Sequence, residues 1–432
     1  MPEAHLGHHL GHQEQLLMNV AYAYPWDIVG DPAAPERLAA LGVEAVALAA
    51  SYHATRAATP YHPAHRVLDV PHAAFYLPVR PSAWGRLVPK SPSWTTPDAY
   101  LQAGDALRAA GLKVHAWTVL THNSVLGREH PDLVVRNAFG DPYPHALCPA
   151  FDDVVDYCER LVREILTVGR PDALILESCG PMGFGHQSIH EKTAGADWDP
   201  VDSDLLSLCF CRACADRYPA GTRDHVKAAI DRSPAGTRDH VAAIDRSPAG
   251  TRGHVAAIDR SPAPGTRAHQ TSTASTPTFT SVEEALGTLA DEVRAVRVDL
   301  SASLRRALVA AARDTAPDVP ITIHASPDPW ATAAFAALPE GEPGADVLVA
   351  NCWGDPATDT ARLARLVELC RPGQRVGAYV LGLPPRPADP EAQADLLRAY
   401  AKAGASEFHL YHAGLASPHR LSAIQQALRL IS

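Results

Sequence analysis

Short apolar segments, rich in β-branched and aromatic residues, alternate along the chain with longer segments whose apolar residues recur at helical spacing. The strand-like segments are residues 18–24, 44–50, 113–120, 172–178, 320–326, 345–353, 375–382 and 406–414. Nearly continuous apolar runs are typical of parallel strands covered by helices. Eight such units predict an α/β protein with a (β/α)8 TIM barrel. A doubly wound open sheet is the alternative. The nucleotide-binding motifs usual for such a sheet are missing, since the first strand is not followed by G-x-G-x-x-G and G-x-x-x-x-G-K-[ST] does not occur.

The region after the fourth strand repeats the phrase PAGTRDHV-AAIDRS, which begins at Pro219, Pro234, Pro248 and, in degraded form, Pro262. Pro, Gly and Ser punctuate every copy, so we expect no helix longer than about two turns there. The repeat predicts a long low-complexity insertion, with a binding arm as the alternative. The predicted organisation is a leader (1–17), a first half-barrel (18–218), the insertion (219–280) and a second half-barrel (281–432).

Composition and charge exclude several classes of protein. The 432 residues carry a formal net charge of −10 without a long basic run, which argues against a nucleic-acid partner. No apolar run approaches membrane-spanning length, and the first residues lack the basic head and apolar core of a signal peptide. We therefore expect a cytoplasmic protein with no membrane partner, in which clustered cysteines are metal ligands rather than disulfides. Oligomerisation stays open.

Polar and aromatic side chains gather at the ends of the predicted strands, where (β/α)8 barrels place their chemistry. Glu177 is the strongest candidate because it closes an otherwise apolar strand, although a structural ion pair is the alternative. Glycosidic bonds are usually cleaved by two carboxylates, and Asp355, then Asp328, are the candidates for the second, each after another strand. A loop cap or turn residue is the alternative for each of them. Aromatic rings stack on sugar rings, so the expected ligand is a small carbohydrate. The residues expected to bind it are Tyr22, His122, Asn123, His324, Trp353 and His412.

A cluster of three cysteines, Cys209, Cys211 and Cys214, has the spacing C-x-C-x-x-C. Thiolates bind Zn²⁺ tightly, and a structural zinc site has four ligands. The fourth ligand is expected to be Cys179, which leaves the same strand as Glu177, with Cys148 and His190 as the other options. Three free thiols packed in an apolar loop are the alternative to this zinc site.

A carboxylate at the end of the fourth strand, followed after a long loop by C-x-C-x-x-C, resembles the family-42 β-galactosidases and related uncharacterised barrel proteins. The resemblance implies that Glu177 is the acid/base residue. It also implies that Cys209, Cys211 and Cys214, with one earlier cysteine, hold a structural zinc. The family's nucleophile is a glutamate at the end of the seventh strand, where AYVLGLPP has none.

Together these features predict a glycoside hydrolase-like enzyme that acts on a sugar or glycoside by carboxylate acid/base chemistry, with Glu177 as the general acid. Two other functions are open at this point. One is a non-hydrolytic carbohydrate-binding barrel, which the missing glutamate of the seventh strand favours. The other is a metal-dependent sugar isomerase or hydrolase that uses His122, His324 and His412 together with Glu177.

Overall fold

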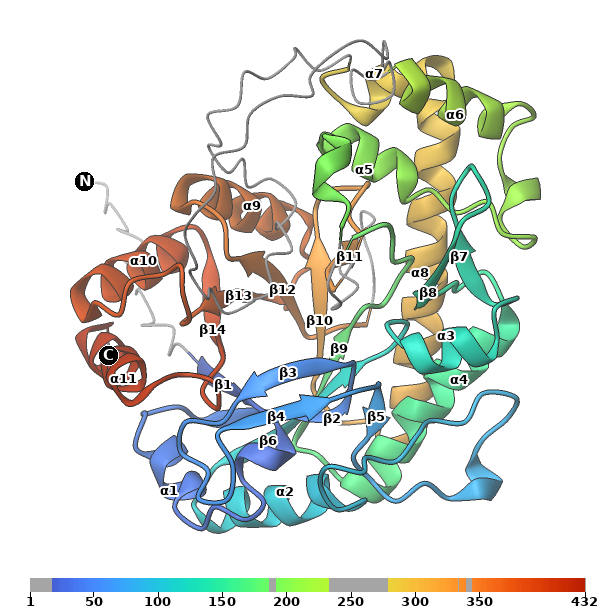
Figure 1. The fold of residues 1–432 in the computed structure, drawn as a ribbon. Coiled ribbons are helices and arrows are strands. Elements are labelled where there is room, and N and C mark those ends of the chain that lie inside the picture. Colours follow the sequence, from blue (N-terminus) through green and yellow to red (C-terminus); the bar gives the residue numbers. More distant parts are fainter. Residues whose placement is uncertain (1–17, 186–191, 233–278, 333, 339–343, 432) are drawn as a thin grey trace, which may run out of the picture.

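The computed structural model describes residues 18–185, 192–232, 279–332, 334–338 and 344–431. Its centre is a barrel of eight parallel strands, which closes because β1 pairs with both β2 and β14 (Figure 1). The barrel strands are β1 (Met18–Ala23), β2 (Ala45–Tyr52), β6 (Lys113–Val119), β9 (Ala173–Glu177), β10 (Ile321–Ser326), β12 (Val347–Cys352), β13 (Arg375–Leu381) and β14 (Ala405–Tyr411). Each coincides with a segment predicted from the apolar pattern, and the predicted (β/α)8 fold is confirmed.

Helices connect successive barrel strands and cover the outside of the barrel (Figure 1). The covering helices are α1 (Ala34–Ala39), α2 (Ala99–Ala109), α4 (Asp152–Glu164), α8 (Ala290–Thr315), α9 (Pro356–Leu369), α10 (Pro390–Lys402) and α11 (Pro418–Ile431). Between β10 and β12 the described residues form no helix, only the short strand β11 (Ala336–Ala337), which pairs with β10. The regular alternation expected of a (β/α)8 barrel is therefore interrupted once in the described chain.

The loops at the carboxyl ends of the strands carry the remaining elements. The antiparallel pairs are β3 (Thr55–Ala58) with β4 (Val67–Val70), β7 (Val134–Arg136) with β8 (Pro142–Leu147), and β5 (Ala74–Phe75) with the end of β2. The short helices are α3 (Ser124–Glu129), α5 (Pro200–Leu206), α6 (Thr222–Arg232) and α7 (Val282–Leu286). Three of these helices, α5, α6 and α7, lie in the connection between β9 and α8 and pack against one another.

Helix α6 corrects the prediction made for the first copy of the repeat. Its 11 residues exceed two turns, and Val226, Ala229 and Ile230 on one face are buried. The punctuating residues do not interrupt it, because Pro219 and Gly221 precede its first residue and Pro234 follows its last. The expected insertion therefore begins after this copy, and the later copies lie outside the described residues.

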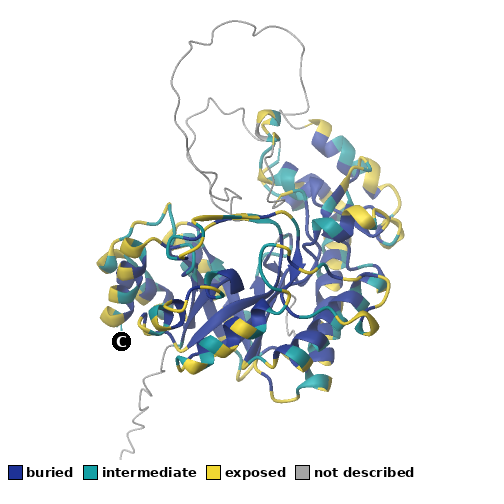
Figure 2. Cartoon of the chain, turned by 60° about the horizontal axis from the view of Figure 1, so that its bottom comes forward, coloured by how far each residue is buried: buried dark blue, intermediate teal, exposed yellow. Residues whose placement is uncertain are grey.

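Polar and aromatic side chains occupy many positions inside the barrel, where branched apolar residues usually dominate. Alternate residues of a strand point to the same side, so Glu407, His409 and Tyr411 of β14 share the inner face. Tyr22 of β1 reaches across to Trp117 of β6, which is not a neighbouring strand, with ring centroids 4.9 Å apart. Figure 2 shows that the barrel strands are almost entirely buried. These interior polar groups therefore need partners within the barrel.

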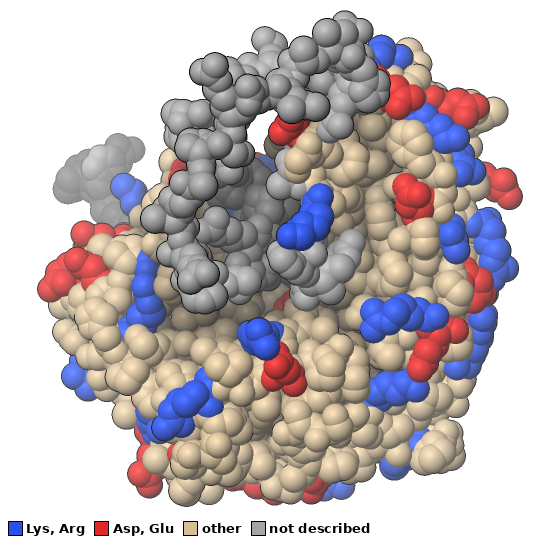
Figure 3. Space-filling model, viewed as in Figure 1, with Lys and Arg blue, Asp and Glu red and all other residues tan. Residues whose placement is uncertain are grey.

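The surface carries charges of both signs. On the face shown in Figure 3, Lys and Arg side chains are interspersed with Asp and Glu side chains. Several are paired, as where Arg86 contacts both Asp132 and Asp153. In the described part of the chain, no helix is both long and apolar enough to cross a membrane.

Candidate active site

Aromatic side chains from several strands gather at the carboxyl-terminal end of the barrel interior. The rings of Trp353 and Tyr379 are stacked with centroids 5.3 Å apart, and the ring of Tyr411 lies 4.8 Å from that of Trp353. The ring of Tyr24 is stacked 5.7 Å from that of Trp117. Trp353 and Tyr411 are half-buried, while the other three are buried. We call these five residues the mouth aromatics; their flat apolar faces suit a sugar ring.

Glu177 ends strand β9 beside this cluster, and its side chain is 6% exposed. Its Oε2 accepts a hydrogen bond of 2.6 Å from Nε1 of Trp117 and lies 3.3 Å from Nδ1 of His324. Both of these contacts involve the same oxygen. Among the described residues, no hydrogen bond to Oε1 is formed.

The surroundings of Glu177 favour its ionised form. Burial opposes ionisation, but the contacts with His324, the hydrogen bond from Trp117 and the proximity of His53 together hold the pKa of Glu177 below its ordinary value. Burial also lowers the pKa of His324, which the neighbouring carboxylate only partly offsets. At neutral pH the resting site therefore contains a carboxylate beside a mainly neutral imidazole. A residue that starts as a carboxylate must receive a proton before it can act as a general acid.

The residues predicted to bind a ligand fall in different places. Tyr22 and His324 lie inside the barrel, with Oη of Tyr22 3.0 Å from Nε2 of His324, and Trp353 is one of the mouth aromatics. His412 is fully buried against Tyr24, at a centroid distance of 4.2 Å, and burial lowers its pKa to about 3. His412 is therefore neutral at physiological pH.

Two other predicted contacts belong to the loop after β6. His122 is buried and stacks on His53 with ring centroids 4.2 Å apart. Asn123 instead forms the N-cap of α3, where its Oδ1 accepts the backbone N–H of Leu126 and its Nδ2 lies 3.4 Å from the hydroxyl of Tyr157. The amide of Asn123 is therefore engaged at the start of a helix, and its contact with a ligand stays a prediction.

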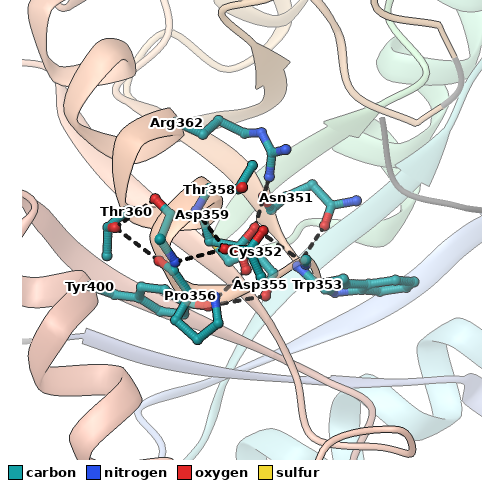
Figure 4. Close-up of polar contacts among 12 residues, drawn as sticks. Asn351, Cys352, Trp353, Asp355, Pro356, Thr358, Asp359, Thr360, Arg362 and Tyr400 are labelled. Carbon is teal, nitrogen blue, oxygen red and sulfur yellow. Dashed lines mark hydrogen bonds and ion pairs between the residues drawn. The ribbon is translucent and has the colours of Figure 1, made fainter. Parts of the chain in front are cut away.

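Asp355, the first choice for a second carboxylate, is exposed at the start of α9 (Figure 4). Its Oδ1 accepts the backbone N–H groups of Ala357 and Thr358, at 3.1 and 3.0 Å. These bonds satisfy amides that have no partner within the helix, which is the role of an N-cap. The structure therefore places Asp355 in a capping position and shows no contact between it and Glu177.

Replacing Asp355 by alanine is expected to lower the thermal unfolding midpoint by about 3 °C, because the two capped amides lose their acceptor. Calorimetry of the Asp355→Ala and Asp355→Asn variants would measure the effect, and asparagine, itself a good N-cap, should restore most of the midpoint. Any activity of the protein should be unchanged in both variants. A large loss of activity in Asp355→Asn would return this residue to the catalytic machinery.

Asp328, the second choice, follows β10 and is half-buried. Its Oδ1 accepts the backbone N–H of Trp330 at 2.9 Å. Burial raises the pKa of Asp328, and burial together with the charge of Asp328 raises the pKa of Asp204 on α5 to about 7. The charge of Asp328 thus disfavours the ionised form of Asp204, a residue that no sequence motif singles out. The structure shows no direct contact between Asp328 and Glu177.

The predicted cysteine trio belongs to a buried cluster of four cysteines, and its fourth member is Cys148. The sulfur of Cys148 lies 3.8, 3.7 and 3.5 Å from those of Cys209, Cys211 and Cys214. Four thiolates around a zinc ion at about 2.3 Å form a tetrahedron with edges of about 3.8 Å. These separations far exceed a disulfide bond. The donor type, the number of donors and their spacing all fit a structural Zn²⁺ site.

The choice of Cys179 as the fourth ligand is corrected. Cys179 is buried just after β9 but is not a member of the cluster. Cys148 follows β8, in the loop after a different barrel strand, and its backbone N–H bonds to the carbonyl of Leu133 at 2.8 Å. The cluster therefore joins the loop after β6 to the loop after β9. His190, the third option, lies outside the described residues.

The histidines proposed for a catalytic metal do not form such a group. Within the described residues, the cysteine cluster is the one set of possible metal ligands close enough to share an ion. His122, His324 and His412 therefore do not assemble with Glu177 into a ligand set, and the metal-dependent isomerase or hydrolase has no geometric support.

No protein-family model matches the sequence, and no curated protein matches it significantly. The catalytic domain of a β-amylase from Paenibacillus polymyxa superposes with a TM-score of 0.51 at 14% identity, over 96% of this chain and 98% of that one. An α-L-fucosidase from Paenibacillus thiaminolyticus superposes with a TM-score of 0.50 at 11% identity, over 97% of this chain and 47% of that one. The chain thus spans about half the length of the fucosidase. At such identities these likenesses show the fold alone: the chain is a (β/α)8 barrel similar to those of glycoside hydrolases.

Proposed function

We propose that the chain is a glycoside hydrolase-type enzyme that binds a small carbohydrate at the barrel mouth and uses Glu177 for acid/base chemistry. One observation carries this proposal. Glu177 lies among the mouth aromatics with Oε2 held by Trp117 and His324, while Oε1 has no hydrogen-bond partner among the described residues. A fixed carboxylate between flat apolar faces is suited to binding a sugar hydroxyl or exchanging a proton with a glycosidic oxygen.

The ionised resting state of Glu177 adds a requirement to its predicted role as general acid. A proton must first reach Oε2, and His324 is the neighbour placed to supply it through Nδ1. Asp328 is the second carboxylate of the proposal, because it follows the strand that carries His324 and is half-buried with a raised pKa. The seventh barrel strand carries Tyr379 and no glutamate, so a nucleophile at that strand is not part of the proposal.

A non-hydrolytic carbohydrate-binding barrel is the second candidate. Two observations favour it. The seventh strand carries a tyrosine instead of a glutamate, and Asp355 caps a helix, so neither position provides a second carboxylate in contact with Glu177. Both candidates need the mouth aromatics, but only hydrolysis requires Glu177 to exchange a proton.

We also propose that Cys148, Cys209, Cys211 and Cys214 hold one structural Zn²⁺. Bound there, the ion would supply a cross-link between the loops that follow β6 and β9. The four buried sulfur atoms, all within 4.8 Å of one another, support this assignment.

The two candidates can be separated with a panel of nitrophenyl glycosides and the corresponding free sugars. Hydrolysis of at least one glycoside is expected, and calorimetric binding without hydrolysis would favour the second candidate. Trp353→Ala should weaken the affinity for the sugar about 10-fold or more. The ring of Trp353 is only half-buried, so part of its face is available for a sugar ring to stack on. Phe139→Ala, which truncates an exposed ring in the turn between β7 and β8, is the control and should have no effect. If no sugar or glycoside binds, both candidates are wrong.

A further inference from the structure

Two histidines inside the barrel are joined by a single tyrosine hydroxyl. Oη of Tyr22 lies 3.0 Å from Nε2 of His324 and 3.1 Å from Nδ1 of His409. All three residues are fully buried. A tyrosine hydroxyl both donates and accepts, so it can accept a proton from one imidazole while it donates its own to the other.

A carboxylate lies at each end of this group. Nδ1 of His324 lies 3.3 Å from Oε2 of Glu177, and Nε2 of His409 lies 3.3 Å from Oε2 of Glu407. Glu177 ends strand β9, whereas Glu407 is near the start of β14, so the two carboxylates lie toward opposite ends of the barrel. Arg375, whose side chain is 46% exposed, lies 3.0 Å from Oε1 of Glu407. The contacts thus run through the barrel from the candidate site toward solvent at the other end.

The number of protons determines how these contacts can be satisfied. Four contacts join the two carboxylates through the imidazoles and the hydroxyl. Three of them have hydrogen-bond geometry, whereas Nδ1 of His324 approaches Oε2 of Glu177 at 3.3 Å without that geometry, and each contact needs one hydrogen to be satisfied. Two neutral imidazoles and one hydroxyl supply only three hydrogens, and one additional proton supplies the fourth. With this proton on His409 or on His324, all four contacts are satisfied. The two arrangements differ only in where the hydrogens reside, so no heavy atom has to move between them.

The buried surroundings keep Tyr22 protonated and keep two of the titratable side chains nearby uncharged. Burial, reinforced by the charges of Glu177 and Glu407, raises the pKa of Tyr22 far above its ordinary value, so its hydroxyl keeps a proton. His115 of β6 faces the same end of the barrel as Glu407, and burial lowers its pKa to about 4. Tyr379 of β13 faces His324 at a centroid distance of 4.9 Å, and its pKa is likewise raised by burial. Neither neighbour adds a charge near neutral pH.

We propose that Tyr22 relays a proton between His409 and His324, so that the barrel interior supplies Glu177 with protons from the end opposite the candidate site. His409 gives its Nδ1 proton to Oη of Tyr22 while Tyr22 gives its own proton to Nε2 of His324. His324 then passes its Nδ1 proton to Oε2 of Glu177, which becomes a neutral acid. This transfer leaves the remaining proton of each imidazole on Nε2. Each imidazole must therefore return to its Nδ1 tautomer before a proton from solvent, entering at Nε2 of His409 from the Glu407 end, restores the starting state. The use of this proton in glycoside cleavage rests on the proposed function, whereas the transfer itself does not.

The relay can be tested by nitrogen NMR of histidine-labelled protein, without any substrate. In the wild type, the ring nitrogens of His324 and His409 should titrate with a common midpoint, because one proton is shared between them. Tyr22→Phe removes the hydroxyl but keeps the ring that packs on Trp117, and should separate the two midpoints by about half a pH unit or more. Tyr379→Phe removes a neighbouring hydroxyl outside the relay and should leave the common midpoint unchanged.

Separate midpoints in the wild type would overturn the relay, as would a common midpoint that survives in Tyr22→Phe. Should Tyr22→Phe not fold, Glu407→Gln gives a second test. It removes the anion that holds the shared proton at His409, so the His324 nitrogens should move toward their protonated shifts. Signals of His324 that do not respond would contradict the proposal. Because no glycoside is present, these outcomes leave the proposed hydrolysis to be judged separately.

Discussion

Glu177→Gln is expected to lower kcat/KM by about 10³-fold for any glycoside that the wild-type protein cleaves. Glutamine keeps the size of the side chain and can still accept the hydrogen bond from Nε1 of Trp117. It cannot, however, take up a proton from His324 or give one to a leaving group. The loss should appear in kcat more than in KM, since an interaction made only in the transition state is removed.

The control for this experiment is Asp355→Asn, which removes a negative charge from the same face of the barrel without changing the contacts of Glu177. Binding calorimetry of Glu177→Gln with the free sugar should show an affinity within a few-fold of the wild type, because the mouth aromatics are intact. If Glu177→Gln cleaves the glycoside at the wild-type rate, Glu177 is not the acid/base residue and the proposed mechanism is wrong.

Much of the fold could be predicted because its signal is local. Each barrel strand is a short apolar run and each covering helix has its own apolar period, so neither needs information from distant parts of the chain. The error at α6 has a local origin too. Pro219, Gly221 and Pro234 are residues that commonly break helices, but here they lie just outside the ends of a helix. The residues that break helices are therefore recognised correctly from the sequence, but the predicted insertion begins before helix α6 instead of after it.

The contacts inside the barrel could be predicted from the sequence only in part. Glu177 could be singled out because a carboxylate that closes an apolar strand is conspicuous within a few residues. The contact between Tyr22 and His409 joins residues 387 positions apart, and nothing near either residue indicates the other. Asp355 could be interpreted in two ways from its neighbours alone. An aspartate that precedes a proline and a helix is a signal for an N-cap, and this interpretation fits the structure.

The cysteines of the proposed zinc site show the same contrast between local and distant signals. The spacing of Cys209, Cys211 and Cys214 is short enough to indicate that the three thiols lie together, and the structure brings them together. The fourth ligand depends on which loop packs against that turn. Cys179 is nearer in sequence, but the hairpin of β7 and β8 brings Cys148 to the cluster instead.

Cys148→Ala should therefore abolish stoichiometric zinc binding and lower the free energy of unfolding by about 4 kcal/mol, a size of effect reached when a metal site is lost. Three thiolates would remain, with one coordination position open to water and chelators. Cys179→Ala is the matched control, since it also truncates a fully buried cysteine, and it should retain zinc and lose only about 1 kcal/mol. Metal analysis of the purified variants, with urea unfolding in the presence and absence of a chelator, measures both quantities.

Wild-type protein purified without zinc and unable to bind it would refute the site. Loss of zinc from Cys179→Ala but not from Cys148→Ala would show that the loop after β9 alone provides the ligands, so that the ion could not cross-link it to the loop after β6.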